Sequence, residues 1–127
     1  MKILGFYEEL WPHRAGEPEG KIKDSIRDVP LPDESDIVEY LARGHDLFSV
    51  MGAEEDVLGS DYRILGGHSV MSDGEWIWRK SLWFYLNRYH IALPDEFIDK
   101  VRAYDYEVPY VPESLLDELA DKVVEIW

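Results

Sequence analysis

The sequence predicts an α+β fold, in which an antiparallel sheet of short strands has three to four helices packed on one side. The strand candidates gather between residues 46 and 78, and most of the helical patterns follow between residues 80 and 126. This grouping favours an antiparallel sheet covered by helices over a doubly wound fold, in which strands and helices alternate. With 46% hydrophobic residues, 127 residues suffice for one buried core, so we expect a single domain over residues 1–127.

The N-terminal quarter of the chain predicts one short strand and a long irregular stretch. Residues 2–6 are mostly apolar and predict an opening strand. Residues 11–32 are rich in turn-forming residues, namely Pro12, Gly16, Pro18, Gly20 and Pro30. Because so long an irregular stretch is uncommon in a compact domain, we expect it to be either a functional loop or a flexible one.

Three helix starts share one local pattern, a proline followed by acidic residues. The pattern occurs at Pro32-Asp33-Glu34, Pro94-Asp95-Glu96 and Pro112-Glu113. Proline at the first helical position costs no hydrogen bond, and acidic residues in the first turn favour the positive end of the helix dipole. The sequence therefore predicts helices over residues 33–43, 95–103 and 113–126.

The first predicted helix should bury Ile37, Tyr40 and Leu41 along one face. It should end at Gly44, because glycine suits the left-handed conformation that follows many helices. A further helix is predicted over residues 80–90. Its apolar face consists of Leu82, Tyr85, Leu86 and Tyr89.

Residues 46–52 and 63–65 predict two strands, and residues 70–78 predict a hairpin. Within the hairpin, Asp73 and Gly74 lie between two apolar runs, which is a strong local signal for a tight turn. The favoured turn needs positive φ at both central residues, and these two residue types tolerate it. We therefore expect Asp73 and Gly74 at the tip of the hairpin.

The charge balance is strongly acidic, with 27 acidic and 13 basic residues and a net charge of −14. Such a surface repels phosphate backbones and anionic membranes, so we expect neither nucleic acid nor membrane as a partner and favour a basic protein partner. No apolar run of about 18 residues and no signal-peptide pattern is present, which favours the cytoplasm. Without cysteine the chain forms neither disulfides nor thiolate metal sites.

Four histidines, His13, His45, His68 and His90, are separated by 32, 23 and 22 residues, which matches no metal-binding motif. His68 is the best catalytic candidate, because Ser69 and Asp73 could place a hydroxyl and a carboxylate beside its ring. No Gly-x-Ser-x-Gly pattern surrounds Ser69, so we favour a structural histidine over a nucleophilic triad. We expect no metal, no cofactor and, on balance, no enzymatic activity.

Trp76 and Trp78 are two residues apart, so on a strand they share one face. They belong either to the core or to a stacking platform for a sugar or a base, and we favour the core. Arg79 follows directly and is expected to form a salt bridge to Asp73 or Glu75 across the hairpin.

Two acidic segments are candidates for partner binding. Glu54, Glu55 and Asp56 predict a solvated turn, whose three carboxylates could also meet a basic partner. In the second segment tyrosines alternate with acids, giving Tyr104, Asp105, Tyr106, Glu107 and Tyr110. Tyrosine offers contact area at low entropy cost, and carboxylates steer a cationic partner. Alternatively, this segment is a strand whose tyrosines pack inward while its acids face water.

One sequence pattern consists of the stretch from Gly66 to Arg79, which contains the segment Ser-Asp-Gly-x-Trp-x-Trp-Arg, and of Leu93-Pro94-Asp95-Glu96-Phe97 further along the chain. It resembles a pattern in small acidic bacterial proteins of no assigned activity. By size, acidity and absence of cysteine, the chain is also similar in type to immunity proteins, which neutralise a co-produced toxin by binding it. The second resemblance implies an inhibitor without turnover and carries over no functional residue.

Two functions follow from these observations. We favour a non-enzymatic binding protein, an immunity-like inhibitor that captures a basic protein partner through an acidic, tyrosine-containing surface. The alternative is a small ligand-binding domain or a hydrolase-like enzyme, with a cleft built from His68, Ser69 and Asp73. The sequence leaves the oligomeric state open.

Overall fold

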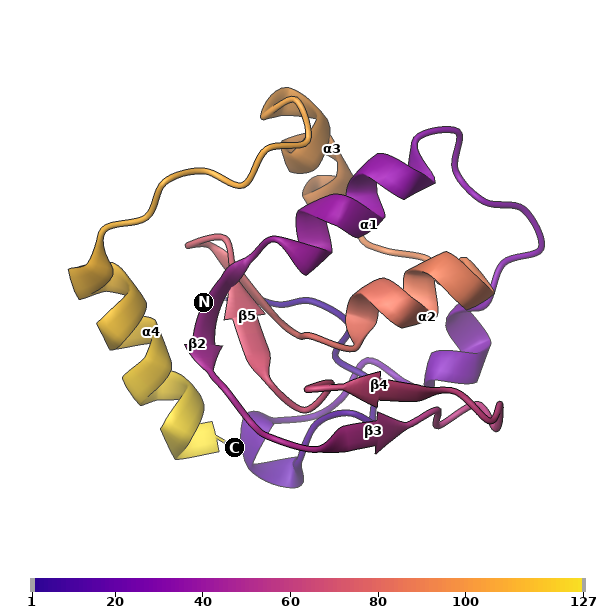
Figure 1. Cartoon of the computed structure of the whole chain (residues 1–127), viewed down its shortest axis with the longest axis horizontal. Coiled ribbons are helices and arrows are strands. Elements are labelled where there is room, and N and C mark those ends of the chain that lie inside the picture. Colours follow the sequence, from indigo (N-terminus) through magenta and orange to yellow (C-terminus); the bar gives the residue numbers. More distant parts are fainter. Residues whose placement is uncertain (1, 127) are drawn as a thin grey trace.

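The structure, a computed structural model, describes residues 2–126 and has an α+β fold, as predicted (Figure 1). The helices are α1 (Glu34–Ala42), α2 (Leu82–Tyr89), α3 (Asp95–Ala103) and α4 (Glu113–Ile126). The strands are β1 (Lys2–Ile3), β2 (His45–Phe48), β3 (Ala53–Glu55), β4 (Arg63–Leu65), β5 (Val70–Ser72) and β6 (Trp76–Arg79). Two short 3-10 helices, η1 (His13–Ala15) and η2 (Ile22–Ser25), interrupt the N-terminal loop.

The main sheet is mixed, with the strand order β1-β6-β5-β2, and strands β3 and β4 form a separate antiparallel pair. Strands β2, β5 and β6 pair antiparallel, as predicted. The expectation of a wholly antiparallel sheet is wrong at β1, which runs parallel to β6 with Lys2 opposite Trp76. The direction of so short a strand depends on a partner more than seventy residues away, and its own residues carry no signal of it.

Strands β5 and β6 form the predicted hairpin, but its tip lies one residue later than expected. Ser72 pairs with Ile77, and the Asp73 amide donates to the Trp76 carbonyl over 3.3 Å. This leaves Gly74 and Glu75 at the tip, where Gly74 has a φ of 98°. Asp73 instead closes the turn with its carboxylate, which accepts hydrogen bonds from the Glu75 and Trp76 amides over 3.0 and 2.8 Å.

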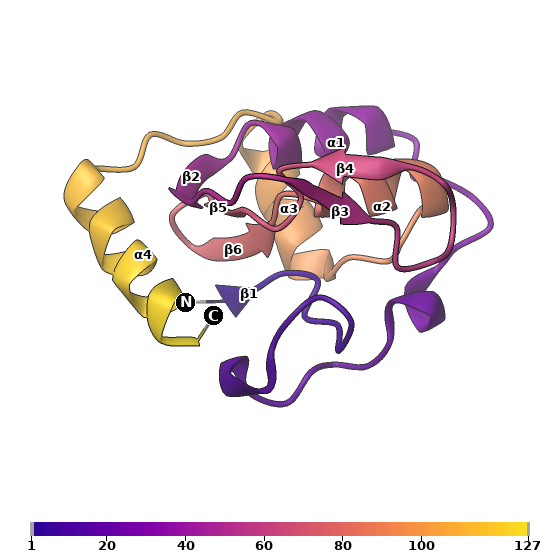
Figure 2. The same ribbon diagram turned by 60° about the horizontal axis from the view of Figure 1, so that its bottom comes forward.

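The helices do not all share one side of the sheet. Helix α1 packs against α2 and α3, whereas α4 lies apart from them, against the edge strand β2 and the η1 turn (Figure 2). Helices α1 to α3 therefore match the prediction of three to four helices on one side, and α4 lies at the edge of the sheet. Among residues 2–126 no helix combines the length and the apolar character that crossing a membrane requires.

The core lies between the main sheet and helices α1 to α3, and it is rich in aromatic rings. Trp76 and Trp78 both contact Phe97 of α3 edge to face, with ring centroids 5.6 and 6.0 Å apart. The Trp78 indole also donates to the Leu41 carbonyl over 3.1 Å. Because both tryptophans are buried, the prediction that they belong to the core is confirmed.

Gly44 follows α1, as predicted, but the reason for glycine is different. Its φ is not positive, so the expected left-handed conformation is wrong. A Cβ at this position would lie 2.6 Å from the Trp78 ring and 3.3 Å from the Met71 Cβ. Glycine is therefore required at position 44 because the backbone lies too close to Trp78 and Met71 to leave room for a Cβ atom.

We expect Gly44→Ala to lower the free energy of unfolding by about 1–3 kcal/mol through overpacking against Trp78. Urea denaturation followed by circular dichroism measures this change. In a Trp78→Phe background the clashing ring atoms are absent, so the same glycine substitution should cost less. An equal cost in both backgrounds would contradict the proposed contact.

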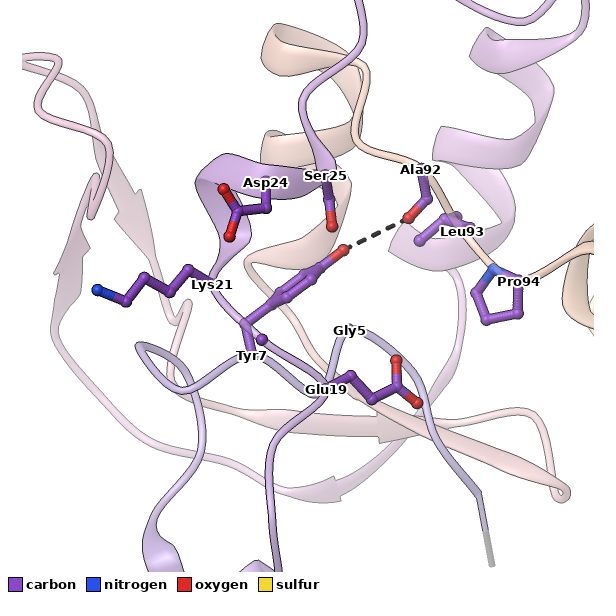
Figure 3. A pocket seen from close by; sticks show the side chains of 10 residues that line it. Gly5, Tyr7, Glu19, Lys21, Asp24, Ser25, Ala92, Leu93 and Pro94 are labelled. Atoms are coloured by element: carbon purple, nitrogen blue, oxygen red, sulfur yellow. Dashed lines mark hydrogen bonds between the residues drawn. The ribbon is translucent and has the colours of Figure 1, made fainter.

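The N-terminal loop is tied to the rest of the molecule at several points. Ile22 and Trp11 are buried in the core. Tyr7 and Gly20 form an isolated parallel bridge, and the Ala92 amide donates to the Ser25 carbonyl over 2.7 Å (Figure 3). These contacts hold residues 11–25 of the loop against the rest of the molecule, which argues against the flexible alternative for this part and leaves the functional one untested.

Candidate functional site

The first predicted acidic segment lies mostly in the interior. Glu54 is on β3, where side chains alternate in direction, and it is 2% exposed. Its carboxylate contacts the Arg79 guanidinium and accepts a hydrogen bond from the Tyr85 hydroxyl over 2.8 Å. The expected salt bridge from Arg79 to Asp73 or Glu75 is therefore wrong, because the partner of Arg79 is a buried carboxylate 25 residues earlier.

Asp56 is also buried, at the start of the loop between β3 and β4. Its carboxylate accepts hydrogen bonds from the Ser60 and Tyr89 hydroxyls and from the Leu58 amide, the last over 2.8 Å. Burial raises the pKa of Asp56, but these hydrogen bonds outweigh it and leave the pKa below its ordinary value. Only Glu55 remains on the surface, so the solvated turn is wrong for Glu54 and Asp56.

His68, Ser69 and Asp73 do not form a catalytic arrangement. Ser69 and Asp73 flank β5, four residues apart, which corresponds to about 13 Å along an extended strand. The Ser69 hydroxyl bonds to the backbone of Val50, and the His68 ring contacts Arg79.

Asp73 has its own partners at the other end of the strand. It accepts a hydrogen bond from the Tyr40 hydroxyl over 2.6 Å and pairs with Lys100 over 3.1 Å. The geometry needed for the hydrolase-like alternative is thus absent at these three residues. Within residues 2–126 no group of three or more histidine, aspartate or glutamate side chains is arranged to hold a metal ion.

The second acidic segment forms the connection between α3 and α4, which crosses from one side of the molecule to the other (Figure 1). It starts in an unusual conformation, because Asp105 and Tyr106 both have positive φ, at 52° and 62°. The Tyr106 amide donates to the Val101 carbonyl over 2.9 Å, which closes the end of α3. Consecutive left-handed residues other than glycine are strained, and such strain persists where surrounding contacts hold it.

Contacts from two other parts of the chain, at Asp33 and at His45, hold this segment in place. The Tyr106 hydroxyl donates to Asp33 over 2.7 Å, and Arg102 donates to the same carboxylate over 2.8 Å. The hydrogen bonds from Arg102 and Tyr106 hold the pKa of Asp33 well below its usual range. At the far end of the segment, the His45 ring bonds to the Pro109 carbonyl over 2.9 Å.

Tyr104 and Tyr110 project from this fixed segment, with 49% and 86% of their surfaces exposed. Asp105 and Glu107 are also exposed, and within residues 2–126 neither forms an ion pair. The alternative of a strand with inward-facing tyrosines is therefore wrong, because these residues form no strand and two tyrosines face solvent. Tyr106 is the exception and serves as an anchor.

Helix α4 continues this surface with more negative charge. Its exposed acidic residues are Glu113, Asp117, Glu118, Asp121 and Glu125. Its buried side chains are Leu119 and Val123. We call Tyr104, Asp105, Glu107, Tyr110 and these five acidic residues the C-terminal surface.

Sequence reasoning missed the residues that fix the C-terminal surface, namely Asp33, His45 and Arg102. Asp33 precedes α1 and His45 lies on β2, and only folding brings these two to the segment, so no local pattern could have identified them. Comparisons of the chain with protein-family models, with curated proteins and with solved structures find no match.

Proposed function

We propose that the protein is a non-enzymatic binding protein of the bacterial cytoplasm, an immunity-like inhibitor that captures a basic protein partner through the C-terminal surface. One observation carries the proposal. Two exposed tyrosines stand beside two exposed carboxylates that have no cationic partner among the described residues, on a segment held in a strained conformation. Strain of this kind, kept by contacts from elsewhere, is typical of binding sites.

The fixed geometry of the segment supports tight binding. A preformed surface loses little conformational entropy when a partner docks. Asp33 and His45 hold the segment at both ends, so Tyr104 and Tyr110 are presented without further ordering of the backbone. Tyrosines that become fully buried at the centre of an interface contribute about 2 kcal/mol or more each.

The charge distribution supports fast capture of a cationic partner. Residues 93–127 carry ten acidic and three basic residues, and the exposed acids of α4 continue those of the segment. A concentrated field of one sign raises the association rate of an oppositely charged protein, and salt weakens it. The structure does not offer Glu54 and Asp56 to a partner, so the C-terminal surface replaces them in this proposal.

The test begins with the immobilised protein and a lysate of the native host, at low and at high salt, followed by identification of the protein retained at low salt. Binding kinetics are then measured for two variants. We expect Asp105→Asn/Glu107→Gln to lower the association rate severalfold at low salt. We expect Tyr110→Ala to raise the dissociation rate, by roughly thirtyfold if Tyr110 is a hot spot worth about 2 kcal/mol.

Matched controls separate local contacts from general charge. Glu17→Gln/Asp61→Asn removes two exposed charges outside the C-terminal surface, and Leu65→Ala removes a side chain that is 80% exposed on β4. Both controls should bind like the parent. If the charge control slows association as much as the Asp105 and Glu107 variant does, or if Tyr110→Ala dissociates at the parental rate, this surface is not the binding site.

A further inference from the structure

Strands β3 and β4 form a small sheet of their own, which lies beside α2 (Figure 1). We call residues 53–65, which comprise both strands and the loop between them, the β3–β4 flap. Among residues 2–126, no ladder of backbone hydrogen bonds joins either strand to the main sheet. The flap therefore depends on its side chains for its attachment to the rest of the molecule.

The deepest attachments of the flap are polar. Its buried side chains are Glu54, Asp56 and Ile64, so two of the three are carboxylates. The Glu54 carboxylate contacts the Arg79 guanidinium on β6 and accepts a hydrogen bond from the Tyr85 hydroxyl on α2 over 2.8 Å. Because a charged group stays buried only while it is paired, the position of the flap depends on these partners.

The remaining contacts of the flap also come from side chains. The Tyr89 hydroxyl on α2 donates to the Asp56 carboxylate. The Tyr62 ring stacks on Phe84 of α2, with ring centroids 4.7 Å apart, and Leu58 is half-buried against the core. Since none of these contacts belongs to the ladder of the main sheet, all of them can break while that sheet stays intact.

Two glycines flank the flap. Gly52 precedes β3 and Gly66 follows β4, with φ values of 104° and 65°, and the Gly66 amide donates to the Gly52 carbonyl over 2.7 Å. Hinges are residues at the ends of elements that absorb changes in φ and ψ, and glycine does so at low cost. Just before the first glycine, the backbone of Val50 bonds to the Ser69 hydroxyl, which fixes the chain up to this point.

We propose that the β3–β4 flap is a hinged lid over Arg79, with Gly52 and Gly66 as its hinges and the Glu54 ion pair as the contact that keeps it closed. In the closed form, which the structure describes, Arg79 is 5% exposed. In the open form the Glu54 carboxylate returns to water, and Arg79 meets solvent together with the Tyr85 hydroxyl. The flap thus controls access to a buried cation in an acidic protein. It is separate from the C-terminal surface and does not depend on the proposed function.

Native-state hydrogen exchange of the full chain, followed by NMR, tests whether the flap opens by itself. A pair of strands is at most marginally stable alone, so the cross-strand amides of β3 and β4 lose protection when the flap detaches. We expect these amides to have protection factors at least about tenfold lower than those of β5 and β6. Equal protection in both pairs would mean that the flap opens only with the whole molecule, and would overturn the proposal.

Variants separate this opening from global unfolding. Tyr85→Phe removes the donor to Glu54 and the acceptor of the Val57 amide, so protection in the flap should fall about tenfold. Tyr110→Phe, at an exposed tyrosine, should leave it unchanged.

Val101→Ala leaves a cavity at a buried position of α3, and this cavity is present in the closed and the open form alike. It should lower the protection of β5 and β6 about tenfold and leave that of the flap unchanged. Parental flap protection in Tyr85→Phe, or an equal loss in flap and sheet in Val101→Ala, would refute the hinged lid.

Phenylglyoxal, which modifies accessible guanidinium groups, tests whether opening exposes Arg79. Peptide mass spectrometry measures the modification rate at each arginine. Arg79 should react about tenfold faster in Tyr85→Phe than in the parent, because the open form is more populated. Arg43, which is exposed, should react at the same rate in both. If Arg79 reacts at the parental rate in a variant whose flap amides exchange faster, Arg79 does not lie under the lid.

Discussion

Replacing Arg79 by leucine should lower the free energy of unfolding by about 3–5 kcal/mol, because it leaves a carboxylate in the interior without its charge partner. The Arg79 guanidinium contacts Glu54 and the His68 ring and donates to the Leu10 carbonyl. After the substitution, the Tyr85 hydroxyl still donates to the Glu54 carboxylate, and the His68 Nδ1 atom lies 3.7 Å from it. Urea denaturation, followed by tryptophan fluorescence and circular dichroism, measures the loss.

Two further variants show whether the unpaired charge is the cause. Arg79→Leu/Glu54→Leu removes both charges and should recover much of the lost stability, since apolar replacements of a buried pair are often well tolerated. Arg63→Leu breaks the exposed pair with Glu55, whose atoms are 3.8 Å apart, and should cost no more than about 1 kcal/mol. Equal costs for Arg79→Leu and Arg63→Leu would show that the buried pair has no special role.

Replacing Leu86 by alanine should lower the free energy of unfolding by about 2–5 kcal/mol through the cavity that it leaves. Leu86 is 1% exposed on α2, which packs against α1. The control is Val124→Ala, because Val124 is largely exposed on α4 and its loss should change stability by no more than about 0.5 kcal/mol. The midpoint of urea unfolding is the measurement, and a Leu86→Ala variant as stable as the parent would refute the packing of α2.

The elements that the sequence predicts best are those with local signals. The bounds of α3 and α4 are as predicted, because a proline and acidic residues mark each start and an apolar stripe continues to each end. The buried faces of α1 and α2 also agree, apart from the half-buried Tyr89. Helical periodicity reports burial without knowledge of the partner element.

Contacts between residues far apart in the chain could not be predicted from the sequence. The parallel direction of β1 depends on β6, and the burial of Glu54 depends on a guanidinium from another strand. Charged residues in a row predict a solvated turn because they are almost never fully buried without a partner. Residues 53–55 carry two carboxylates and only one small apolar residue, so the pattern gave no sign of β3.

The C-terminal surface was predictable in composition but not in geometry. Alternating tyrosines and acids in a segment limited by prolines left two alternatives open, an exposed surface and a strand with inward-facing tyrosines, and the structure has Tyr104 and Tyr110 exposed. The sequence could not separate Tyr106 from them, because its role depends on Asp33, which lies 73 residues earlier.

The shallow attachment of α4 has a thermodynamic consequence for any partner that spans the C-terminal surface. A helix of 14 residues that buries two side chains, and that packs against one edge strand and one turn, opens at a lower free energy than the sheet beneath it. The acids of α4 are therefore presented by a helix that buries two of its 14 side chains, whereas Tyr110 lies on a fixed segment. When a partner binds both Tyr110 and the acids of α4, immobilising α4 costs part of the binding free energy. The affinity therefore depends on how firmly Leu119 and Val123 hold the helix.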